Sequence, residues 1–198
     1  MYPLFETIKV FDGKAYNLEW HQWRLEKSYN SYYGKNIKCK LADIISIPEE
    51  EKTGFIRLRF NYNQTDYKLD FEPYESRKIS SLKLILDDAI DYSLKYSDRT
   101  CFARLLAQKK NCDDILIIKN HLITDASFSN IAFYDGERWK TPKLPLLKGT
   151  CRERLIYESA IYEEDIEVNE LFKFKSYKLI NALLDIHDSE SLDISTII

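Results

Sequence analysis

Residues 54–74, GFIRLRFNYNQTDYKLDFEPY, carry the clearest strand signal of the chain. Every second residue in the first half of this stretch is apolar or aromatic: Ile56, Leu58, Phe60 and Tyr62. The same alternation resumes after an Asn-Gln-Thr turn region, at Tyr67, Leu69 and Phe71. A period of two is typical of strands with one buried face, so the stretch predicts two strands joined by a turn.

The residues before this stretch predict a short strand pair followed by a helix. In FETIKVFDGKAYNL, two β-prone runs flank Asp12-Gly13, a dipeptide that favours tight turns. Asn17 is then expected to cap a helix that ends at Gly34, because apolar and aromatic residues recur at helical spacing between them. A second, weaker helical pattern covers residues 40–47.

The rest of the chain alternates short strands with single helices. SLKLILDD predicts a strand, and a polar segment at residues 87–93 follows it. Ser97 is expected to cap a helix, four short strands follow in DILIIK, LITD, NIAFYD and ERWKT, and a further helix covers residues 150–162. This order predicts an α+β fold with a small N-terminal domain at residues 1–90, a larger C-terminal domain at 91–198 and a ligand cleft between them.

The composition argues against several classes of protein. The net charge of -3 gives no reason to expect a nucleic acid or a membrane surface as partner. No apolar stretch reaches the roughly 20 residues that span a bilayer, and charges come too early for a signal peptide. The four cysteines are scattered without metal-ligand spacing, which favours reduced thiols and no metal site. We therefore expect a soluble, cytoplasmic protein.

Lys95, in SLKYSDR, lies at the joint between the two predicted domains. Most lysines are solvated surface charges, and residue type alone favours that interpretation. A lysine at a domain joint can instead be desolvated in a cleft, where it loses its charge more easily and becomes a Schiff-base nucleophile.

Two further segments are candidates for chemistry. In LKGTCRER, Gly149 and Thr150 open a predicted helix, whose free N–H groups and Thr hydroxyl form an anion site, or else only a helix start in a basic loop. Asp125, in ITDASFSN, follows an apolar strand and is either a site carboxylate or part of an Asx-type turn. The three histidines suggest no catalytic arrangement, and no P-loop or GxGxxG motif occurs.

Six segments in this order resemble the class IV aminotransferases, the fold type IV enzymes that use pyridoxal phosphate. They are LFETIKVFDGK, HQWRL, LKYSDR, LITDASFSNIAF, TPKLPLLKGTCRERL and LINAL, which together extend over nearly the whole chain. The family includes branched-chain and D-amino-acid aminotransferases and 4-amino-4-deoxychorismate lyase. The resemblance implies a compact two-domain enzyme of this fold type and a homodimer.

The resemblance also implies roles for residues around the cofactor. Lys95 would form the Schiff base, and Asp125, which stands where the family usually has Glu, would pair with the pyridine nitrogen. Arg24 would clamp the phosphate, and Arg99 would either reach the phenolic oxygen or only support the helix start. The remaining cofactor-binding positions would be Gly149, Thr150, Asn130, Asn181 and Ala182.

Substrate binding is less constrained by the resemblance. Lys9 falls where many relatives carry a substrate-facing Arg, and Arg59 is either a ligand for a substrate carboxylate or an exposed strand charge. The chain begins directly at the FET strand, and LLDIHDSES stands where relatives have Pro-Val. Both regions help to shape the substrate pocket in the family, so the resemblance carries over cofactor chemistry better than substrate identity.

The preferred prediction is a 4-amino-4-deoxychorismate lyase, which releases pyruvate and gives 4-aminobenzoate for folate biosynthesis. The alternative is an aminotransferase that acts on branched-chain or D-amino acids, with the same lysine moving a proton. Both take a small-molecule amine or amino acid as substrate and need pyridoxal 5'-phosphate. A third hypothesis, a non-catalytic binding protein that kept the fold, is disfavoured by the joint presence of Lys95, Arg24, Asp125 and Gly149-Thr150.

Overall fold

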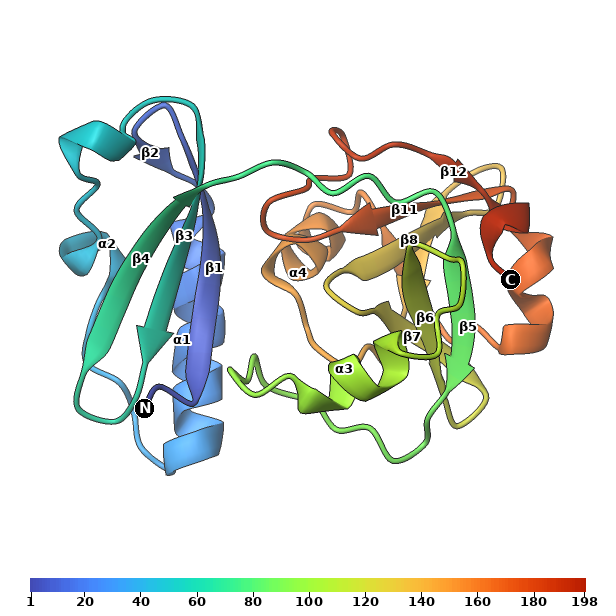
Figure 1. Cartoon of the computed structure of the whole chain (residues 1–198), viewed down its shortest axis with the longest axis horizontal. Coiled ribbons are helices and arrows are strands. Elements are labelled where there is room, and N and C mark those ends of the chain that lie inside the picture. The colour runs from blue at the N-terminus through green and yellow to red at the C-terminus, as the bar shows by residue number, and fades with distance from the viewer. The chain divides into compact units, whose positions relative to one another are not determined.

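The computed structural model describes residues 1–198 and has an α+β fold (Figure 1). The chain divides into two compact units: residues 1–76 with 94–98, and residues 77–93 with 99–198. The division therefore begins earlier than the predicted position near residue 90, and residues 94–98 return to the first unit. None of the helices combines the length and the apolarity that crossing a membrane requires.

The first unit is built on a four-stranded sheet of order β2-β1-β3-β4. Its strands are β1 (Leu4–Phe11), β2 (Lys14–Ala15), β3 (Phe55–Tyr62) and β4 (Tyr67–Pro73), and its helices are α1 (Leu18–Tyr33), α2 (Leu41–Ile44) and the 3-10 turn η1 (Glu49–Glu51). All neighbouring strands are antiparallel, so the predicted pair at residues 54–74 is confirmed as β3 and β4. The Asp12-Gly13 turn joins β1 to β2 as predicted.

Helix α1 covers one face of this sheet (Figure 1). The strand residues on that face, among them Leu4, Ile8 and Leu58, are fully buried with Leu25 of the helix. Gly34 ends α1 in the left-handed conformation at φ 65°, as its position predicts. Asn17 occupies the N-cap, but its backbone is left-handed and its side chain makes no capping hydrogen bond.

The second unit contains a three-stranded and a five-stranded sheet, of orders β5-β6-β7 and β10-β9-β8-β11-β12. The strands are β5 (Leu82–Leu86), β6 (Asp114–Lys119), β7 (Leu122–Ala126), β8 (Asn130–Tyr134), β9 (Trp139–Pro142), β10 (Tyr162–Glu164), β11 (Ser176–Ile180) and β12 (Leu192–Asp193). The helices are α3 (Thr100–Leu106), α4 (Thr150–Tyr157) and the 3-10 turns η2 (Val168–Lys173) and η3 (Ile194–Thr196). Most pairings are antiparallel, and β5–β6 and β9–β10 are parallel. The apolar residues of β6, β7, β8 and β11 form the main core of this unit.

Three predicted helices differ from the structure. The pattern at residues 40–47 forms only the four-residue α2, and the helix expected over residues 150–162 ends at Tyr157, because Ser159 turns the backbone to φ 58°. The prediction that Ser97 caps a helix was wrong, since α3 begins at Thr100. Ser97 instead donates its backbone N–H to Pro3 in a strand-like pairing, which removes it from the helix start.

Candidate functional site

The segment that carries Lys95 is attached to the edge of β1. The Lys95 carbonyl accepts a hydrogen bond from the Phe5 N–H at 3.1 Å, and Leu4 and Tyr96 form an antiparallel bridge. The Lys95 side chain is half-buried, and its Nζ lies 4.9 Å from the centre of the Phe5 ring. Lys95 is therefore held by backbone pairing and by an aromatic contact, and it is not a fully solvated surface charge.

Arg24 lies in a buried charge network that the sequence did not reveal. Its Nε and Nη2 donate to the two carboxylate oxygens of Glu6, at 2.9 and 2.5 Å, and His21 Nδ1 lies 2.7 Å from Glu6 Oε2. Glu6, His21 and Arg24 are 0, 1 and 5% exposed. The bidentate pairing occupies one edge of the guanidinium and leaves Nη1 for another acceptor.

The pKa values of this network follow from burial and pairing. Burial alone would raise the pKa of Glu6, but the charge of Arg24 and the hydrogen bonds from His21 and Arg24 outweigh it and lower the pKa to about 2. Burial lowers the pKa of His21, against the opposing effect of Glu6. The period of β1 could have pointed to Glu6, because it places this carboxylate on the same face as Leu4 and Ile8, where a charge needs a partner.

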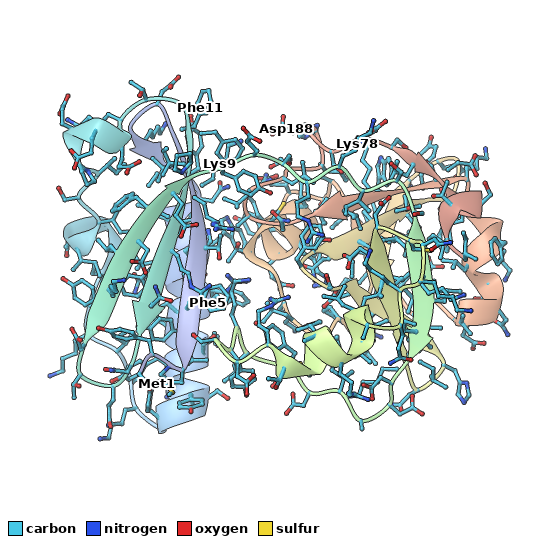
Figure 2. All side chains as sticks on the ribbon, in the orientation of Figure 1. Met1, Phe5, Lys9, Phe11, Lys78 and Asp188 are labelled. Atoms are coloured by element: carbon cyan, nitrogen blue, oxygen red, sulfur yellow. The ribbon has the colours of Figure 1, made fainter.

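The opposite face of the same sheet carries the two predicted substrate-binding cations. Figure 2 labels Phe5 and Lys9 along β1, and strand alternation puts both on this face. Arg59 Cζ lies 3.8 Å from the centre of the Phe5 ring, so Arg59 and Lys95 contact the same aromatic side chain. Lys9 lies four residues farther along, with its Nζ 5.0 Å from the centre of the Phe55 ring.

Arg59 is oriented by a chain of polar contacts. Its Nε donates to Asn61 Oδ1 at 2.7 Å, and Asn61 Nδ2 donates to Asp70 Oδ2 at 2.9 Å. Arg59 is half-buried, so it differs from the exposed strand charge that the sequence also allowed.

In the second unit, Asp125 and Asn130 meet between the end of β7 and the start of β8. Asn130 Nδ2 donates to Asp125 Oδ1 at 2.7 Å and to the Leu147 carbonyl at 2.9 Å, and the Leu147 N–H donates to Asp125 Oδ2 at 3.0 Å. Asp125 is 5% exposed, and burial raises its pKa to about 6 although these donors and Arg152 oppose the shift. The Asp125 carboxylate thus accepts a hydrogen bond from Leu147, which lies 22 residues later in the chain, and it does not form the local Asx turn.

Helix α4 begins at Thr150 with Gly149 as its N-cap. The Thr150 hydroxyl is buried and has no hydrogen-bond partner, so this helix start retains an unsatisfied polar group. Two neighbouring cations are neutralised: Arg152 is wholly buried and pairs with Glu153 and Glu163, and Arg154 pairs with Glu158 and Asp185. An anion site here would depend on Gly149 and Thr150 rather than on a solvated basic loop.

The remaining predicted residues have local partners. Arg99 Nη2 donates to the Ser127 carbonyl at 2.5 Å, which links the start of α3 to the loop after Asp125. Asn181 Oδ1 accepts from the N–H groups of Leu183 and Leu184, so its side chain supports the turn that contains Ala182. All four cysteines are free thiols, and no group of three or more acidic, His or Cys side chains could hold a metal ion.

Comparison with known proteins identifies the family. Residues 3–188 match the family described as "Amino-transferase class IV". The chain belongs to the class IV aminotransferase family. The family resemblance expected from the motifs is confirmed, and so is the α+β fold type.

Three individual proteins are similar to this chain. A Haemophilus influenzae protein named "Uncharacterized protein" is 40% identical over 185 residues, covering 92% of this chain and 98% of its own length. A solved structure from Haemophilus somnus, described as a "putative 4-amino-4-deoxychorismate lyase", is 39% identical with a TM-score of 0.89 and covers 94% of this chain and 98% of its own. A Mycobacterium tuberculosis "hypothetical aminotransferase" in its "PLP-bound form" is 16% identical with a TM-score of 0.74, covering 99% of this chain and 81% of its own, and shares the fold.

Proposed function

We propose that this chain is a pyridoxal-phosphate-dependent enzyme and that it acts as a 4-amino-4-deoxychorismate lyase, releasing pyruvate to give 4-aminobenzoate. The observation that carries the cofactor proposal is the buried, unpartnered hydroxyl of Thr150 at the start of α4, in the same unit as the buried carboxylate of Asp125. A helix start with a free hydroxyl suits a phosphate, and a buried carboxylate suits a protonated ring nitrogen. The residues present therefore fit the cofactor.

Each residue of the proposed site has a role that its chemistry supports. Lys95 Nζ would hold the cofactor aldehyde, and the Nη1 donors of Arg24 with the Gly149-Thr150 helix start would hold its phosphate. Asp125 would keep a proton on the ring nitrogen. When bound, the cofactor supplies an electron sink for the charge that develops on the substrate carbon.

The chain's own residues then have two tasks during the reaction. Lys95 Nζ would act as general base on the substrate carbon that bears the amine, and would pass that proton to the pyruvate group that leaves as its enol. Arg59, oriented by Asn61 on the ring of Phe5, would bind a substrate carboxylate as a charge-assisted donor. The proposal includes the homodimer and the cytoplasmic location expected from the sequence.

The lyase is preferred over the aminotransferase because of similarity to the Haemophilus somnus protein that carries this name, at 39% identity over nearly the whole of both chains. The two reactions use the same cofactor residues, so only the substrate pocket distinguishes them.

The first experiment tests the cofactor. Purified protein incubated with pyridoxal phosphate should acquire a visible absorbance band that Lys95→Ala abolishes. Arg57→Ala, an exposed cation on the same strand as Arg59, is the matched control and should keep the band. A protein that takes up no pyridoxal phosphate would overturn both enzyme hypotheses and favour a non-catalytic binding protein.

The second experiment tests the reaction. The loaded protein is incubated with 4-amino-4-deoxychorismate and, separately, with amino acids plus 2-oxoglutarate. Formation of 4-aminobenzoate and pyruvate in equal amounts supports the lyase. Formation of glutamate without 4-aminobenzoate would establish the aminotransferase instead.

Sedimentation analysis of the same sample tests the homodimer.

A further inference from the structure

The side chain of Asn130 connects the end of β7 to the loop that precedes α4. Its Nδ2 group donates to Asp125 Oδ1 at 2.7 Å and to the Leu147 carbonyl at 2.9 Å. Leu147 returns a backbone hydrogen bond to the other oxygen of Asp125 at 3.0 Å. One carboxylate oxygen of Asp125 is therefore held by the loop that leads to Gly149 and Thr150, and the other by Asn130, which bonds the same loop.

The third contact of Asn130 explains why residue 149 is glycine. Gly149 has φ -70° and ψ 142°, a backbone conformation that any residue adopts, so glycine is not required there for conformational freedom. A Cβ at this position would instead overlap the Oδ1 atom of Asn130. The absence of a side chain at residue 149 is thus what allows Asn130 to lie against the start of α4.

We infer that Asn130 is a positioning residue that couples Asp125 to the Gly149-Thr150 helix start, so that a shift of one of these two parts of the cofactor site also shifts the other. This inference rests on the proposed function, because it assigns the ring-nitrogen carboxylate to Asp125 and the phosphate donors to the helix start. A change at Gly149 must displace Asn130, and displacement of Asn130 removes the side-chain hydrogen bond that Asp125 accepts from it. A substitution at Gly149, on the phosphate side of the site, should therefore also disturb the carboxylate of Asp125.

The experiment compares the affinities of the purified apoprotein for pyridoxal phosphate and for pyridoxal, which lacks the phosphate. Thr150→Val is the matched control, because it removes a phosphate-side hydroxyl that makes no hydrogen bond to Asn130. It should weaken pyridoxal phosphate binding about tenfold and leave pyridoxal binding unchanged. Gly149→Ala should weaken the binding of both compounds about tenfold or more, because it also disturbs Asp125.

A second variant keeps the inference testable if Gly149→Ala folds poorly. Asn130→Ala removes the hydrogen bonds without adding volume, and it should weaken the binding of both compounds about tenfold, because Asp125 loses the hydrogen bond from Asn130. In the double variant Asn130→Ala with Gly149→Ala, the second change should add little, because the Oδ1 atom that the new Cβ would overlap is gone. Urea unfolding of the apoprotein should show the same non-additivity without any cofactor.

The outcomes separate the inference from the proposed function. If the wild-type chain binds neither compound, the proposed function fails. If the wild-type chain binds both but Gly149→Ala weakens only pyridoxal phosphate, as Thr150→Val does, the coupling is refuted. Additive effects of Asn130→Ala and Gly149→Ala on unfolding would also refute it.

Discussion

Replacing Glu6 by Gln should destabilise the first unit by about 3 kcal/mol at neutral pH. Glu6 is fully buried and bonds Arg24 through both carboxylate oxygens, so the variant leaves a buried guanidinium without its counter-charge. Removal of one partner of a buried ion pair costs about 3–5 kcal/mol. The pKa of Glu6 leads to a similar value, because lowering it from 4.5 to about 2 corresponds to about 3 kcal/mol of stability.

The pH dependence has a definite sign. A carboxyl group with a lowered pKa in the folded state contributes its full stability above its unfolded value of 4.5, and this contribution is lost as the pH falls through about 2. The difference in unfolding free energy between wild type and Glu6→Gln should therefore be largest above pH 5 and shrink toward pH 2.

Tryptophan fluorescence during urea unfolding can measure this difference in the first unit. Trp20 and Trp23 lie on α1, so a Trp139→Phe background confines the signal to that unit. Glu72→Gln is the matched control: Glu72 pairs with Arg57 at the surface and should change stability by less than about 1 kcal/mol. A loss below about 1 kcal/mol for Glu6→Gln, or a loss that does not vary between pH 5 and 2, would refute the reasoning.

Three further predictions concern the second unit. Without cofactor, Thr150→Val should raise the unfolding free energy by about 1 kcal/mol, because it replaces a buried unpartnered hydroxyl with a methyl group; a loss of stability in chemical unfolding would show that the hydroxyl has a partner. Cys101 should be alkylated in the folded chain before Cys151, because burial raises the pKa of Cys151 to about 12. Mass spectrometry after brief iodoacetamide treatment measures the order, and earlier modification of Cys151 would contradict the prediction. Leu116→Ala should cost about 2–5 kcal/mol, since Leu116 is fully buried in the main core, and thermal unfolding with a shift of under 2 °C would contradict this.

Local patterns in the sequence were sufficient for much of the fold. The alternation at residues 54–74 predicted β3 and β4, and Asp12-Gly13 and Gly34 marked the first turn and the end of α1, because each depends only on neighbouring residues. Ser97 was misassigned for the opposite reason. A serine three residues before a helix resembles a cap, but pairing with Pro3, more than 90 residues earlier, removes it from that position.

The sequence by itself determined the order of the elements, the family, and the residue types of the candidate site: a lysine, an aspartate and a Gly-Thr helix start. Their roles at the cofactor stay predictions. Only the tertiary structure decided the partners of these residues, since Glu6 pairs with Arg24 and His21 across a sheet and a helix, and Asp125 meets Asn130 and Leu147 between a strand and a loop. Such pairings depend on strand register and on burial of the charges away from water, and neither can be read from the spacing of residues along the chain.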